Sequence, residues 1–148
     1  MSKYERAVLS LLSFLLVAYL TGCTNQSTRS RIPSEVEAVV ASIGDDIAQE
    51  RYEKIYNEAS SLWRQDATEE QSTETFKTLR SKLGKVENRT VHSAIEQQNA
   101  SGPLKGHVFI ITYQTKFERG QAMEVFTLIE EGGSWKLARY FVSSTELK

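Results

Sequence analysis

Cys23 is the side chain with the clearest chemical potential in this chain, because it is the only cysteine and its position is distinctive. It ends the run Leu20-Thr21-Gly22-Cys23, which follows an uncharged, largely apolar stretch over residues 7–20. Lys3 and Arg6 precede that stretch, and a charged segment followed by an apolar one is typical of an export signal. A lone cysteine in an exported protein cannot form an internal disulfide, so we expect its thiol to serve another purpose.

The residues Leu20-Thr21-Gly22-Cys23 resemble the lipobox of bacterial lipoproteins. The resemblance implies that a diacylglycerol is attached to Cys23 and that a peptidase cleaves between Gly22 and Cys23. Acylated Cys23 then anchors the protein in the lipid bilayer of the cell envelope. Because Thr24 and not aspartate follows, the expected membrane in a Gram-negative cell is the outer one, on its periplasmic side. In other bacteria it is the outer face of the cell membrane.

The alternative to lipid anchoring is a retained transmembrane helix. Such a helix needs about 20 apolar residues, and the uncharged run over 7–20 has 14. The division expected from these features is a signal peptide over 1–22, a lipidated cysteine with a polar, flexible tether over 23–33, and one domain over 34–148. The chain has 18 basic and 19 acidic residues, a balance that argues against a nucleic-acid partner.

No other group of residues matches a known catalytic or metal-binding pattern. His92 and His107 are the only histidines, and a zinc site needs three or four ligands. The glycine-rich loops that hold nucleotide phosphates are absent, and no serine stands in a Gly-x-Ser-x-Gly elbow. The sequence therefore predicts no catalytic residue, no metal and no cofactor.

The first part of the domain has the pattern of amphipathic helices. Ser34 and Glu37 have capping-box spacing at the start of an apolar stripe, and Gly44 weakens the helix that follows. A bend is expected near residues 50–51, after which the helical pattern continues to residue 59.

A second helix start is expected at Thr68, because Gln71 stands at the capping-box distance. Gly84 fits the left-handed position just beyond the end of this helix. The segment over 85–98 then gives only a weak strand pattern, and residues 99–106 have the composition of a loop.

The last part of the chain has the pattern of an antiparallel meander. Residues 107–117 alternate clearly, and turns over 118–121 and 131–134 separate them from strands over 123–130 and 135–142. Helices followed by hairpin-connected strands predict an α+β fold with the helices on one face of the sheet. The uninterrupted run Tyr140-Phe141-Val142 breaks the alternation, so we expect the outer sheet face to be partly covered.

Two motifs resemble a family of exported bacterial proteins catalogued as domain of unknown function 4019. They are Leu-Gly-x-Val-x-x-Arg at 83–89 and Gly-x-Trp-x-x-x-x-Tyr-Phe at 133–141, within a similarity over about 47–142. The resemblance implies N-terminal helices on a curved antiparallel sheet, in the manner of the nuclear-transport-factor-2-like cone. It also implies a homodimer through the outer sheet face, and it lends no catalytic residue.

A curved sheet of this kind implies an internal pocket, for which the candidates are Tyr113, Trp135 and Arg139. The interior is expected to be mainly apolar, since Asp and Glu concentrate in the predicted helices and turns. An apolar pocket with few polar groups suits a binding site for a peptide or small ligand. We therefore predict a non-catalytic binding or interaction domain. The alternative is a small hydrolase or isomerase that uses the pocket.

Overall fold

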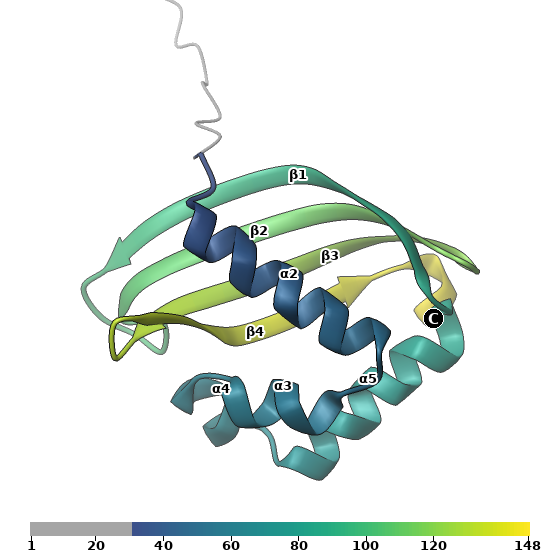
Figure 1. The fold of residues 1–148 in the computed structure, drawn as a ribbon, viewed down its shortest axis with the longest axis horizontal. Coiled ribbons are helices and arrows are strands. Elements are labelled where there is room, and N and C mark those ends of the chain that lie inside the picture. Colours follow the sequence, from purple (N-terminus) through teal and green to yellow (C-terminus); the bar gives the residue numbers. More distant parts are fainter. Residues whose placement is uncertain (1–30) are drawn as a thin grey trace, which may run out of the picture.

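The computed structural model describes residues 31–148, and its α+β architecture is the one predicted from the sequence (Figure 1). Helices come first and an antiparallel sheet follows. The elements are α2 (Ser34–Ala48), α3 (Tyr52–Glu58), α4 (Ser61–Asp66), α5 (Glu69–Leu83), β1 (Val86–Asn99), β2 (Gly106–Phe117), β3 (Gly120–Glu131), β4 (Ser134–Ser143) and the short 3-10 helix η1 (Thr145–Leu147). The lipobox lies outside the described residues. Within residues 31–148 no helix combines the length and the apolar character that a membrane span requires.

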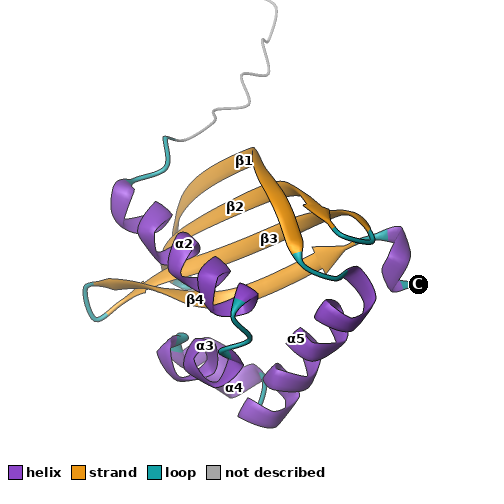
Figure 2. Cartoon of the chain, turned by 45° about the vertical axis from the view of Figure 1, so that its right-hand side comes forward, coloured by secondary structure: helices purple, strands orange, loops and turns teal. Residues whose placement is uncertain are grey.

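The four strands are ordered β1-β2-β3-β4, so β1 and β4 are the two edges of the sheet. The sheet curves around α2, which crosses its inner face, while α3, α4 and α5 lie beside β4 (Figure 2). β1 spans 14 residues, so nearly the whole segment over 85–98 that gave only a weak strand pattern is one continuous strand. Register shifts at residues 87 and 92 interrupt its pairing with β2, and they explain why alternation along this strand is hard to recognise.

Two capping boxes were predicted from the sequence, and the structure contains one of them. Thr68 and Gln71 form the expected capping box on α5. The capping box predicted at Ser34 is wrong, because Pro33 is the N-cap of α2 and no side chain caps that end. Ser34 lies inside the first turn, where its hydroxyl donates to the Glu35 carboxylate at 3.3 Å. Helix α4 was not predicted. Ser60 caps it by accepting from the backbone N–H of Trp63.

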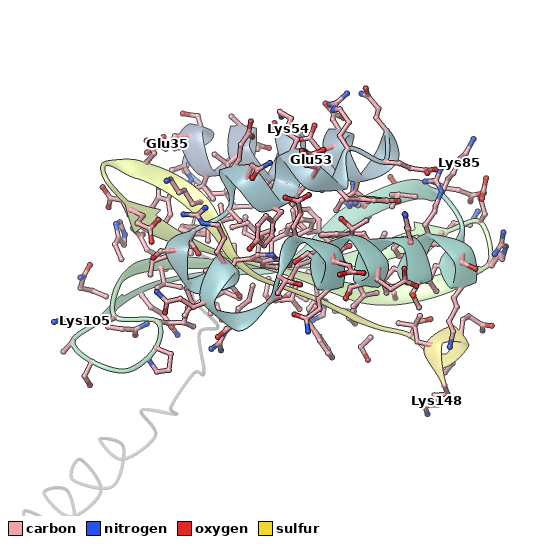
Figure 3. All side chains as sticks on the ribbon, turned by 90° about the horizontal axis from the view of Figure 1, so that it is seen from below. Glu35, Glu53, Lys54, Lys85, Lys105 and Lys148 are labelled. Atoms are coloured by element: carbon pink, nitrogen blue, oxygen red, sulfur yellow. The ribbon has the colours of Figure 1, made fainter. Side chains whose placement is uncertain are left out.

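The main core lies between the inner face of the sheet and helices α2, α3 and α5, where side chains fill the space (Figure 3). The alternation predicted for β2 is confirmed, since Phe109, Ile111 and Phe117 are buried on the inner face. Phe76 of α5 joins the helices to the sheet. Its ring stacks on Tyr52 at 5.4 Å and contacts Tyr140 at the same distance.

A buried carboxylate fixes the corner between α2 and α3. Asp46 accepts hydrogen bonds from Arg51 Nε and Lys54 Nζ, both at 2.7 Å. Burial alone would raise the pKa of Asp46, but the hydrogen bonds from Lys54 and Arg51 outweigh it and hold the pKa below its ordinary value. The turn itself passes through Glu50, which has a φ of 58°.

The outer face of the sheet is partly covered, and the described part of the cover comes from the chain itself. Val108, Ile129 and Ala138 are buried there beneath Leu62 of α4 and Leu104 of the β1–β2 loop. The pairing of β3 with β4 shifts at Ala138, because Leu128 pairs with Leu137 while Thr127 pairs with Arg139. This bulge turns Tyr140 and Val142 inward and leaves Phe141 outside with 63% of its surface exposed.

Candidate functional site

The three residues predicted to share a pocket lie in three separate places. Tyr113 is half-buried on β2, with its ring edge-on to Phe126 at 5.8 Å. Trp135 lies at the other end of the sheet, where it contacts the rings of Phe109 and His107. Arg139 is exposed, because the bulge at Ala138 turns it to the outer face. The structure therefore does not bring these three side chains together.

The inner face of the sheet instead carries a buried ionic network around Glu124 of β3. The Glu124 side chain is fully buried and forms a two-pronged ion pair with Arg89 of β1. Arg89 Nε lies 2.6 Å from Oε2, and Nη2 lies 3.0 Å from Oε1. Thr115 Oγ1 donates to Oε2 at 2.8 Å, and the Tyr140 hydroxyl donates to Oε1 at 2.6 Å.

This network was missed in the sequence, where acidic residues were assigned to helices and turns. The available signal was the position of Glu124, two residues before Phe126 on the same face of β3. A carboxylate offers about four lone-pair sites, and here four donors occupy them. All the acceptor sites of Glu124 are therefore occupied by neighbouring donors. The carboxylate has no free lone pair with which to accept a proton from a substrate.

The protonation states of Arg89 and Tyr140 agree with their hydrogen bonds to Glu124. Burial alone would lower the pKa of Arg89, but its hydrogen bonds with Glu124 raise the pKa above its ordinary value. Burial raises the pKa of Tyr140 well above its ordinary value, and the neighbouring Glu124 charge adds to that effect. Tyr140 therefore stays protonated and donates to the carboxylate. Burial likewise raises the pKa of Tyr113.

Gly44 has a packing role in this network that the sequence did not reveal. It is buried in the middle of α2, where glycine costs helix stability. A Cβ at this position would lie 2.9 Å from Nη1 of Arg89. The glycine therefore lets the guanidinium group of Arg89 pack directly against the helix backbone.

A second polar cluster joins three strands at the far end of the inner face. His107 of β2 bonds to Glu96 of β1 at 2.7 Å and to Glu130 of β3 at 2.9 Å. Hydrogen bonds to Glu130 and Glu96 raise the pKa of His107 above its ordinary value. The two carboxylates bind different ring nitrogens, so they do not converge on one point.

Within residues 31–148 no group of His, Asp and Glu side chains is arranged to hold a metal. His92 is exposed beside the irregularity in β1.

An open groove of about 1140 Å³ lies between α5 and β4, and we call it the α5–β4 groove. Trp63 of α4 lines the groove, and its position is fixed by stacking on Phe76 and by donation from Nε1 to Ser72 Oγ at 3.0 Å. Tyr140 also lines the groove, so the same ring connects it to the buried Glu124. The lining residues are Trp63, Asp66, Ala67, Glu70, Gln71, Ser72, Glu74, Thr75, Thr78, Leu79, Ala138, Arg139, Tyr140 and Phe141.

One wall of this groove is the free edge of the sheet. β4 pairs with β3 on one side only. On the other side, the Ser60 backbone N–H donates to the Leu137 carbonyl at 2.9 Å, so the edge of β4 already has a partner at Leu137. Beyond it, no backbone group in the described part of the chain pairs with the outer edge of residues 138–141. The groove thus combines an apolar floor with unpaired strand backbone.

One protein family matches most of the described domain. The family described as "Protein of unknown function (DUF4019)" matches residues 39–140. The matched segment contains Arg89, Glu124 and Tyr140, and nearly all of the groove lining. No curated protein matches the chain.

Proposed function

Since the chain belongs to the DUF4019 family of proteins of unknown function, whose description names no activity, we propose a role from the site itself. The domain is a non-catalytic binding module, and the α5–β4 groove is its binding surface. The observation that carries this proposal is the groove, in which a mainly apolar floor lies beside an unpaired strand edge. Concave apolar surfaces with a few polar groups are what binding sites present.

The inner face of the sheet supports this assignment. A general acid or base needs a free proton site within reach of a substrate, whereas all four sites of Glu124 are taken by Arg89, Thr115 and Tyr140. Such an arrangement braces the sheet and holds Tyr140 in place beneath the groove. The alternative function, a small hydrolase or isomerase acting through an interior pocket, would have to break this network first.

The location proposed for the module is the cell envelope, with acylated Cys23 in the bilayer. The support is the Leu20-Thr21-Gly22-Cys23 run behind its uncharged leader. Each buried methylene contributes about 0.8 kcal/mol, and stable anchoring takes more than one chain. Metabolic labelling with a fatty-acid probe should mark the wild type and neither Cys23→Ala nor Cys23→Ser. A wild type without lipid that salt washes from membranes would refute the anchor.

Thermal-shift screening of envelope metabolites and peptides tests the binding role. Thr78 lines the groove and Ser81, one helical turn further along α5, does not. A ligand of the groove should stabilise the wild type and Ser81→Trp, and its effect should be lost in Thr78→Trp. Equal stabilisation of both variants would place the ligand elsewhere. Turnover of the ligand that disappears in Tyr113→Phe would replace the binding role by the enzymatic alternative.

A second copy of the chain is a further proposed partner. Ile95 and Phe141 are the large apolar residues most exposed in the described domain, at 43% and 63%. The strand register places both on the outer face. Light scattering at micromolar concentration should give the mass of a dimer, and a monomer mass would remove this proposal.

A further inference from the structure

The charges around the α5–β4 groove are unevenly distributed. Asp66, Glu70 and Glu74 line its helical side and form what we call the acidic rim. All three are exposed, and none of them makes an ion pair with any residue in the range 31–148. Arg139 is the one basic side chain in the lining, and it is not paired with the rim. The groove therefore has a net negative charge that the described residues leave uncompensated.

The shape of the groove favours an extended polypeptide as the ligand. Its volume of about 1140 Å³ exceeds the range of roughly 300–1,000 Å³ that small-molecule pockets occupy. Its sheet-side wall, residues 138–141, offers strand backbone without a partner on the outer side. A peptide that adds a strand to such an edge gains main-chain hydrogen bonds, while pockets for alternate side chains supply specificity.

From these two features we propose that the partner of the groove is an extended, positively charged polypeptide segment that adds a strand to the edge of β4. Its basic side chains lie along the acidic rim, and an apolar side chain covers the floor beside Leu79. This inference rests on the proposed binding role of the groove and names the chemical class of its partner. The negative charge of the rim also disfavours the anionic headgroups of a lipid surface.

Fluorescence anisotropy with the detergent-solubilised full chain tests the charge requirement. The probes are a short labelled peptide of alternating lysine and threonine around a central leucine, and counterparts with glutamine or glutamate in place of lysine. The basic peptide should bind most tightly, and added salt should weaken it. Exposed charge pairs each contribute a few-fold, so neutralising the rim with Asp66→Asn, Glu70→Gln and Glu74→Gln should raise its Kd roughly tenfold.

A matched control separates this effect from the overall charge of the protein. Glu35, Asp45 and Glu53 are exposed carboxylates on α2 and α3 that do not line the groove, and Figure 3 labels two of them. The variant Glu35→Gln/Asp45→Asn/Glu53→Gln should bind the basic peptide with nearly the wild-type Kd. Equal weakening by the two triple variants would refute recognition by the rim.

Backbone methylation tests the added strand. Methyl groups on alternate peptide nitrogens should abolish binding in one register and leave it nearly unchanged in the other, because only every second N–H of a strand faces its neighbour. Equal effects of the two patterns would overturn strand addition.

The outcomes also separate this inference from the proposed function. If the glutamine peptide binds as well as the basic one, and Thr78→Trp blocks both, the groove remains a binding site and the charge requirement is wrong. If the basic peptide binds equally to Thr78→Trp and Ser81→Trp, it occupies another surface and both proposals fail. If it does not bind at all, the proposed partner class is wrong.

Discussion

Replacing Glu124 with glutamine removes the charge from the buried network while nearly preserving its shape. The guanidinium group of Arg89, which is only 21% exposed, then loses the carboxylate that neutralises it. Removing one partner of a buried ion pair destabilises a protein by about 3–5 kcal/mol. The amide oxygen of glutamine can still accept one or two of the original hydrogen bonds, so we expect a loss near 3 kcal/mol. That is a large share of the roughly 5–15 kcal/mol that stabilises a domain.

Urea unfolding of the single and double variants measures this energy directly. Arg89→Met should destabilise by a similar amount, because it leaves the Glu124 carboxylate buried without its counter-charge. The double variant Arg89→Met/Glu124→Leu should lose less than the sum of the losses in Arg89→Met alone and Glu124→Leu alone, since an apolar pair can replace a buried ion pair at little cost. We expect a coupling energy of about 2 kcal/mol, with the m-value unchanged. Thr115 and Tyr140 lose an acceptor in the double variant, so recovery should be incomplete.

A small effect of Glu124→Gln on stability would refute this reasoning. If Glu124→Gln changes the free energy of unfolding by less than about 0.5 kcal/mol, as an ordinary surface substitution does, the network does not brace the sheet. An enzymatic role for the interior would then gain weight, because a carboxylate buried without contributing to stability calls for another function.

Three further predictions concern other parts of the domain. Gly44→Ala should destabilise the domain by about 1–3 kcal/mol although alanine has the better helix propensity, because the new Cβ collides with the Arg89 guanidinium, which Glu124 holds in place. A rise in Tm would contradict this. The raised pKa of His107 means that its contribution to stability is complete below its ordinary value of 6.5 and is lost as pH rises through the higher folded value; unfolding as a function of pH should show that loss, and His107→Gln should abolish it. The lowered pKa of Asp46 has the opposite sign, so its contribution is present above 3.8 and is lost as pH falls through the lower folded value; acid unfolding should begin at higher pH in Asp46→Asn if other carboxylates are unchanged, and an identical acid transition would argue against it.

Much of the fold could be predicted because it depends on local patterns. The alternation over residues 107–117 identified the inner face of β2, and the Thr68 capping box located the start of α5. Gly132 and Gly133 have positive φ in the predicted turn between β3 and β4. Helix α4 was not predicted, because its six residues are too few for a helical period to show.

The site depended on features that local patterns do not contain. Strict alternation puts Trp135 and Arg139 on one face, and the bulge at Ala138 turns Arg139 to the other. Glu124 looks like an exposed strand residue until Arg89, 35 positions earlier, is placed beside it by the pairing of β1, β2 and β3. The groove likewise joins α4 and α5 to β4 across some sixty residues of chain, so only the tertiary structure reveals it.

The two tryptophans offer the most direct test of the central claim, that the α5–β4 groove is the binding surface. Trp63 lines the groove, whereas Trp135 lies at the other end of the sheet against His107. Titration of the basic peptide into Trp135→Phe should shift or quench the emission of Trp63 with the Kd found by anisotropy. In Trp63→Phe, the emission of Trp135 should stay constant. A response from Trp135 with none from Trp63 would contradict the account and place the ligand outside the groove.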